Sequence, residues 1–149
     1  RSTGVSTSLG IAKYVVRMFQ DAGVVLERDY SFNPRRKGIE RFSDASDERR
    51  SQLIAENPLY GRIVCRCETV TEAEIIQAIH RPVGARTVDA IKRRVRAGTG
   101  RCQGGFCGPK VIEILARELK LPAAEVRKNL MGSYMLTGQI REEERCGDA

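Results

Sequence analysis

The sequence predicts a mostly α-helical protein with one small core domain and additional segments at both ends. Apolar residues recur at helical spacing in several stretches, and helix-starting patterns precede two of them, the capping-box sequence Thr71-Glu-Ala-Glu and the proline at position 109. The chain has 149 residues, of which 41% are hydrophobic and 5% aromatic, and it has no Trp. This composition suffices for a single small core.

The first predicted helix follows a loop over residues 1–8 that is rich in hydroxyl side chains and glycine. Its apolar side contains Ile11, Val15, Val16 and Phe19. Gly23 is expected to end it. Free amides at such a helix start favour an anion or the electron-rich edge of a cofactor, although an ordinary N-cap is the simpler interpretation. Because the chain opens without an initiator Met, we interpret residues 1–23 as the end of a preceding domain.

Residues 24–61 are predicted to be a linker that contains one short helix. The first half of this stretch is polar and basic, and Pro34 and Gly38 interrupt any regular pattern in it. Ser46 is a suitable N-cap for the short helix, which should end before the Asn57-Pro58 pair.

Residues 62–138 are predicted to form a helical domain with loops at its cysteines, entered through an extended segment. Four helices are expected, beginning at Thr71, near Thr87, at Pro109 and at Pro122, the last reaching about Leu130. Residues 139–149 are mostly charged and are expected to be a mobile tail, with Cys146 as a bystander.

Four cysteines form two close sequence pairs, Cys65-Arg-Cys67 and Cys102-Gln-Gly-Gly-Phe-Cys107. The first pair is too close for a comfortable disulfide, and the total of five cysteines is odd, so metal ligation is favoured. Four soft thiolates suit either a tetrahedral zinc ion or an iron-sulfur cluster.

The glycines favour the cluster over zinc. Five of the eleven residues 98–108 are glycine, so the backbone can approach a bulky inorganic core and point amides at its sulfurs. A cluster of two irons with four thiolates carries a formal charge of about −2, or about −3 when reduced. Arg66, Arg101 and the basic run 86–96 would offset that charge, unless the run is simply a solvated helix face. A structural zinc module and a thiol switch that cycles to disulfides are the alternatives.

Two stretches carry a family resemblance: Ile63-Val-Cys-Arg-Cys-Glu-Thr-Val-Thr and Gly98-Thr-Gly-Arg-Cys-Gln-Gly-Gly-Phe-Cys-Gly-Pro. They resemble the bacterioferritin-associated-ferredoxin-like (BFD-like) [2Fe-2S] domain. More narrowly, they are similar to the version at the C-terminal end of FAD-dependent glycerol-3-phosphate dehydrogenases and related flavoprotein oxidoreductases. The resemblance covers about residues 31–138, and the four-residue gap in the second pair follows the flavoprotein branch.

The resemblance implies which residues bind cofactors. The implied cluster ligands are Cys65, Cys67, Cys102 and Cys107. In the full-length protein, FAD would face the first helix start, at Ser2, Thr3, Gly4 and Val5. The implied parent enzyme oxidises sn-glycerol 3-phosphate to dihydroxyacetone phosphate, and this part of it passes single electrons from the flavin domain of the same polypeptide to an acceptor protein or subunit. The chain alone is not expected to be catalytic.

Other classes are disfavoured by what the sequence lacks. The net charge of +7 permits a nucleic-acid partner, but no helix-turn-helix or aromatic RNA-binding signature accompanies it, so none is expected. The nearest dinucleotide-like stretch has Gln103 where a third glycine is needed. No apolar run spans a bilayer and no signal peptide is present, which predicts a cytoplasmic protein. The single histidine, His80, is expected to cap a helix end rather than to bind metal.

Overall fold

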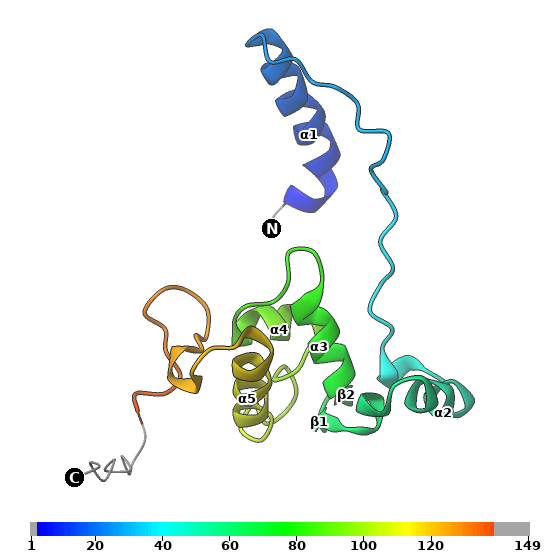
Figure 1. The fold of residues 1–149 in the computed structure, drawn as a ribbon, viewed down its shortest axis with the longest axis vertical. Helices are drawn as coiled ribbons and strands as arrows, with labels where there is room; N and C mark the ends of the chain where they lie inside the picture. The colour runs from blue at the N-terminus through cyan, green and yellow to red at the C-terminus, as the bar shows by residue number, and fades with distance from the viewer. Residues whose placement is uncertain (1–2, 139–149) are drawn as a thin grey trace, which may run out of the picture. The chain divides into compact units, whose positions relative to one another are not determined.

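The computed structural model describes residues 3–138, which form two compact units (Figure 1). The first unit extends to Lys37 and the second begins at Gly38. Helices dominate, and the described strands form a single two-stranded sheet, so the predicted mostly α-helical class is confirmed. Within residues 3–138 no helix combines the length and the hydropathy that a membrane crossing requires.

The first unit is one long helix, α1 (Gly4–Asp21), followed by an irregular segment. The helix ends as the sequence predicts, because Gly23 adopts a φ of +79° and donates its amide to the carbonyl of Gln20. No side chain of α1 is buried. The large apolar side chains that it exposes are Val5, Leu9, Ile11, Tyr14, Val15, Val16, Met18 and Phe19.

The second unit opens with a small apolar cluster that precedes the cysteines in sequence. Its elements are the 3-10 turn η1 (Phe42–Asp44), the helix α2 (Asp47–Glu56) and the 3-10 turn η2 (Pro58–Gly61). Phe42, Leu53 and Tyr60 pack there with Ala73. Ser46 caps α2 as predicted, since its side chain accepts a hydrogen bond from the amide of Arg49. The structure thus includes residues 38–61 in the second compact unit, whereas the sequence pattern predicted a linker over residues 24–61.

The first cysteine pair lies on a short β-hairpin. The strands β1 (Ile63–Cys65) and β2 (Val70–Thr71) pair antiparallel, with Ile63 opposite Thr71 and Cys65 opposite Val70. The extended approach to Cys65 agrees with the sequence, and the two short strands lie in a domain that is otherwise helical. Strands of three and two residues are too short to show the alternating pattern by which a strand is recognised.

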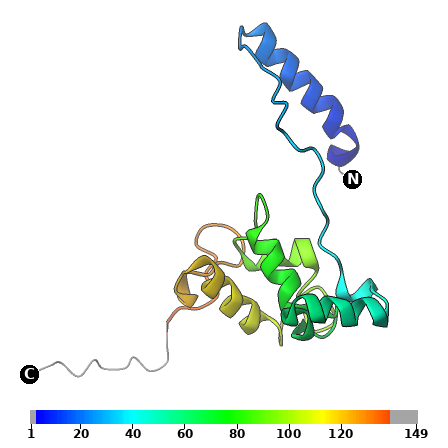
Figure 2. The same ribbon diagram turned by 45° about the vertical axis from the view of Figure 1, so that its right-hand side comes forward.

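Three helices enclose the main core of this unit, namely α3 (Glu72–His80), α4 (Val88–Val95) and α5 (Gly108–Leu119). They lie against one another in both views (Figures 1 and 2). The side chains of Ile75, Ile79, Ile91 and Leu115 are completely buried between them. Each such burial stabilises the fold by about 1.5–3 kcal/mol.

The start of α3 follows its sequence pattern closely. The Thr71 hydroxyl accepts a hydrogen bond from the amide of Glu74, and the Glu74 carboxylate accepts one from the amide of Thr71. This reciprocal capping box satisfies two amides at the helix start and confirms the prediction. It also positions β2, because Thr71 belongs to both elements.

The helix expected from Pro122 to about Leu130 is not formed. The structure has one 3-10 turn, η3 (Ala123–Glu125), followed by an extended segment anchored in the core by Val126. The carbonyls of Arg127 and Lys128 accept hydrogen bonds from the amides of Val88 and Asp89, at 3.1 and 2.9 Å. These amides have no partner inside α4, and the carbonyls of Arg127 and Lys128 supply one to each of them.

Candidate metal centre

The four cysteines predicted as ligands line one pocket of about 500 Å³. Cys65 ends β1, and Cys67 lies in the turn of the hairpin. Cys102 lies in the loop after α4, and Cys107 is the N-cap residue of α5. The hairpin and the α4–α5 loop therefore bring together two motifs that are far apart in the chain.

Inside the pocket the thiols form two pairs, each joining one sequence motif to the other. The Sγ atoms of Cys67 and Cys102 are 3.7 Å apart, and the thiols of Cys65 and Cys107 are hydrogen-bonded to each other. We call Cys67 and Cys102 the outer pair, because Cys67 is exposed and Cys102 is half-buried. Cys65 and Cys107, which are 1% and 2% exposed, are the inner pair.

The four thiols suit more than one kind of metal centre. Among the described residues, no three His, Cys, Asp or Glu side chains stand close enough together to hold one metal ion. A tetrahedral zinc site needs all four sulfurs at about 2.3 Å from a single ion. A binuclear cluster with four cysteine ligands takes two sulfurs at each of its metal atoms, a donor set that two pairs of thiols can also supply.

The two pairs also differ in electrostatic environment. Backbone amides of Phe106 and Gly104, together with the thiol of Cys67, hydrogen-bond to Cys102 and lower the pKa of its thiol. Burial, followed by repulsion from Cys65, raises the pKa of the Cys107 thiol to about 11. The glycine-rich loop thus points amides at a sulfur, as its composition predicts, and it stabilises negative charge at the outer pair.

The glycines of this loop are required by geometry. A Cβ at Gly100 would collide with the Cβ of Cys67, because the loop passes directly against the hairpin turn. Gly98 and Gly104 have φ angles of +83° and +90°, a region that strains any residue with a side chain. A side chain at Gly100 would therefore push the two cysteine motifs apart, and side chains at Gly98 and Gly104 would strain the loop.

Two arginines of the basic run 86–96 have partners outside the pocket. The Nη2 atom of Arg94 donates to the carbonyl of Val83 at 2.7 Å, and Arg93 is ion-paired to Asp89 at 3.8 Å. For these two arginines the structure favours the second of the two interpretations, a solvated helix face. Closer to the site, Arg96 is ion-paired at 2.8 Å to Glu68, the residue after Cys67.

Three other cations line the cysteine pocket. They are Arg66, Arg101 and Lys110, all of them exposed and without an ion pair in the described part of the chain. Phe106, which is 86% exposed, lines it as well. Phe106 and Lys110 were not among the site residues predicted from the sequence. The sequence offered a signal for each of them: Phe106 is an aromatic residue between two predicted ligands, and Lys110 lies in the first turn of the helix that follows Cys107.

His80 lies outside the pocket. Its Nε2 atom is 2.7 Å from Oε2 of Glu118, so it joins the end of α3 to α5. The contact is a hydrogen bond between side chains of two helices rather than the expected cap of a helix end.

The residues predicted to face FAD belong to the first unit. Thr3 is the N-cap residue of α1 but makes no side-chain cap, and Gly4 and Val5 begin the helix, all three exposed. Ser2 lies outside the described residues, as does Cys146.

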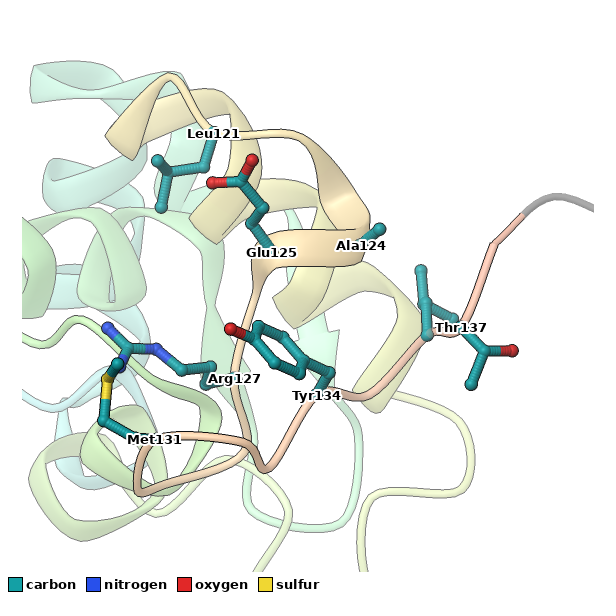
Figure 3. Close-up of a pocket in the computed structure, with 8 residues that line it drawn as sticks. Leu121, Ala124, Glu125, Arg127, Met131, Tyr134 and Thr137 are labelled. Carbon is teal, nitrogen blue, oxygen red and sulfur yellow. The ribbon is translucent and has the colours of Figure 1, made fainter.

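A second pocket, of about 720 Å³, lies in the segment after α5 (Figure 3). Its lining residues are Leu121, Ala124, Glu125, Arg127, Met131, Tyr134, Leu136 and Thr137. In Figure 3 the guanidinium of Arg127 lies at the sulfur of Met131. This pocket is larger than the cysteine pocket but holds no thiol or histidine, so the candidate metal centre is chosen by the chemistry of the lining and not by the volume.

Comparison with known proteins agrees with this geometry. Residues 63–117, which include both cysteine motifs, match the BFD-like [2Fe-2S] binding domain. This part of the chain is therefore a BFD-like [2Fe-2S] binding domain.

Curated relatives extend the likeness. Glycerol 3-phosphate dehydrogenase from Caloramator mitchellensis is 50% identical over 142 residues, covering 95% of this chain and 30% of the relative. An opine oxidase subunit from Rhizobium meliloti is 38% identical over 102 residues, covering 67% of this chain and 18% of the relative. An anaerobic glycerol-3-phosphate dehydrogenase subunit from Escherichia coli strain K12 is 31% identical over 70 residues, covering 47% of this chain and 13% of the relative. The chain thus spans less than a third of each of these proteins, and no solved structure matches it significantly.

Proposed function

We propose that this chain is the electron-transfer part of a flavin-dependent dehydrogenase and that it binds a [2Fe-2S] cluster through Cys65, Cys67, Cys102 and Cys107. The observation that carries the proposal is the arrangement of the four thiols as two pairs in one pocket. The outer pair would hold one iron and the inner pair the other. When bound, such a cluster accepts and releases one electron at a time.

The protein around the thiols supports this role. Amides of Phe106 and Gly104 point at the Cys102 sulfur, and α5 begins immediately after Cys107. Both features favour negative charge in the pocket, because backbone N–H groups and helix starts carry partial positive charge. Gly100 lets the second motif lie against the first, so that the sulfurs are held in place before the metal arrives.

We further propose that the full-length enzyme contains FAD and oxidises sn-glycerol 3-phosphate to dihydroxyacetone phosphate. Support comes from the relative that is 50% identical over 95% of this chain and is described as a glycerol 3-phosphate dehydrogenase. The exposed apolar side chains of α1 support a missing neighbour, since a helix with no buried residue needs a surface to cover its apolar side. We propose that a flavin domain of the same polypeptide covers it and that residues 2–5 face the flavin.

Metal and sulfide analysis after anaerobic purification tests the cluster. We expect about two irons and two acid-labile sulfides per chain, with visible absorbance that bleaches on reduction by dithionite. About one zinc per chain and a colourless protein would instead support a structural zinc module. Thiols that take up neither metal and cycle to disulfides would support a thiol switch.

The substrate requires a separate test on the full-length enzyme. After anaerobic addition of sn-glycerol 3-phosphate, the cluster absorbance should bleach, because electrons from the substrate reach the cluster through the flavin. D-lactate, which lacks the phosphate, serves as the control and should leave the absorbance unchanged. If neither compound bleached the cluster absorbance, sn-glycerol 3-phosphate would be ruled out as the substrate, and the cluster assignment would still stand.

A further inference from the structure

We propose that the mouth of the cysteine pocket is the docking surface for an acidic electron-carrier protein, which approaches the outer pair. We call this surface the pocket rim and define it by Arg66, Arg101, Phe106 and Lys110. The inference rests on the proposed electron-transfer function and names the kind of partner that this function needs.

The first observation is the unequal exposure of the sulfurs. Cys67 is exposed, whereas Cys65 and Cys107 are 1% and 2% exposed. Electron transfer between proteins weakens steeply with distance, so a carrier gains most by contacting the protein where the metal centre is closest to solvent. In this unit that place is the outer pair, and the rim residues are exposed side chains that line the same pocket.

The second observation is that the cations of the rim are not neutralised. Arg66, Arg101 and Lys110 have no ion pair in the described part of the chain. By contrast, Arg49 and Arg117, on other surfaces of the same unit, are bound to carboxylates at 2.7 and 2.6 Å. Three uncompensated positive charges around one opening attract a negatively charged surface and accelerate its encounter.

The third observation is the aromatic residue among these cations. Phe106 is 86% exposed although it lies between two ligands, so it contributes little to the core. Arginine and aromatic residues are enriched in protein–protein interfaces, where an apolar centre is surrounded by a polar rim. A small apolar centre within a charged rim suits the small, transient interfaces of redox partners. It is less suited to a permanent domain interface, which is larger and more apolar.

Two small one-electron acceptors of opposite charge test the proposal, acidic plastocyanin and basic cytochrome c. The 149-residue chain with its cluster is reduced by dithionite, freed of excess reductant and mixed with each acceptor in a stopped-flow instrument. Each acceptor metal gains the one electron that the reduced cluster loses. We expect faster transfer to plastocyanin than to cytochrome c, with a rate that falls as salt is raised.

A triple variant removes the charges of the rim, Arg66→Gln with Arg101→Gln and Lys110→Gln. A matched control removes three charges outside the pocket, Arg86→Gln with Arg93→Gln and Arg94→Gln. The rim variant should slow transfer to plastocyanin about tenfold relative to cytochrome c, and the control less than about twofold. Because both acceptors use the same donor, the ratio of the two rates cancels any change in reduction potential. Phe106→Ala should also slow transfer to plastocyanin while keeping its salt dependence.

Each outcome is decisive. Equal ratios for the rim variant and the control variant would overturn the docking surface. Binding of duplex DNA that depends on the rim residues, measured by fluorescence anisotropy, would also overturn it if the rim variant left electron transfer to plastocyanin unchanged. In the full-length enzyme, a rim variant that slows reduction of the cluster by substrate, but not its oxidation by plastocyanin, would assign the rim to the flavin domain instead. A wild-type chain that binds no cluster would refute the proposed function itself, which the visible spectrum reveals before any mixing.

Discussion

At the scale of single residues, the outer and inner pairs give the four cysteines different environments. The buried inner pair is surrounded by core residues, and the outer pair is bound by amides and open to solvent. Both pairs are nevertheless needed, because each would supply two of the four ligands.

Serine substitution tests the ligands. Changing any one of Cys65, Cys67, Cys102 and Cys107 to Ser should weaken cluster retention at least about tenfold, because loss even of outer-shell partners commonly costs about 10- to 100-fold in metal affinity. Retention is measured by visible absorbance and iron content after gel filtration. Cys146→Ser, outside the described residues, is the control and should retain the cluster. An unchanged spectrum in any of the four variants would remove that cysteine from the ligand set.

A second prediction at this scale concerns the charge of Arg101, which lines the pocket. Arg101→Gln should lower the reduction potential by roughly 20–60 mV, because the positive charge favours the more negative reduced cluster. Arg94→Gln is the control, since Arg94 is hydrogen-bonded to the carbonyls of Ala90 and Val83 away from the pocket. Redox titration measures both, and the Arg101 effect should shrink at high salt. Equal shifts in the two variants would contradict a specific role of Arg101.

At the scale of elements, α3 and α5 are joined by a hydrogen bond and an ion pair beside the apolar core. His80 Nε2 is 2.7 Å from Glu118 Oε2, and Arg117 Nη2 is 2.6 Å from Oε1 of Glu72. These contacts hold α5, and therefore Cys107 at its start, against α3. The hydrogen bond from His80, and then that from Arg117, lowers the pKa of Glu118 below its usual value of about 4.5.

This lowered pKa predicts an acid-dependent loss of stability. The folded state binds the Glu118 proton more weakly than the unfolded state, so the contribution is fully present above about pH 4.5 and is lost as the pH falls through the lowered folded pKa. The Glu118→Gln variant should therefore unfold at a lower urea concentration than wild type near pH 5.5. The gap between the two urea midpoints should close toward about pH 2.5. Glu113→Gln, on the same helix, is the control. A gap that stays constant with pH would contradict this account.

At the scale of the whole molecule, metal binding and folding should be coupled, because the four ligands come from elements that meet only in the folded chain. Removing the cluster with a chelator under reducing conditions should lower the melting temperature by about 10 °C, a loss of about 2 kcal/mol for a domain of this size. Calorimetry of the loaded and metal-free forms measures the difference, with the Cys102→Ser variant as the control. Equal melting temperatures of the two forms would show that the fold holds the thiols without help from metal.

Several local features follow from the sequence by itself, because they depend on neighbours within a few residues. The capping box at Thr71, the N-cap at Ser46 and the helix end at Gly23 form as predicted, since each involves hydrogen bonds over one turn of the chain. The identity of the cofactor class is equally local, because it rests on the type and spacing of the cysteines. The glycines at 98, 100 and 104 were also informative, since each serves a backbone conformation or a close approach.

Other features were decided only by the tertiary structure. The segment after Pro122 has helical composition, yet it forms only the short turn η3, and the carbonyls of Arg127 and Lys128 beyond it cap α4, which is more than thirty positions earlier in the sequence. The pairing of Cys67 with Cys102, the orientation of Arg94 away from the pocket and the exposure of Phe106 likewise depend on how the hairpin and α5 pack. Such contacts join residues that are distant in the chain, and no periodicity or spacing within either segment encodes them.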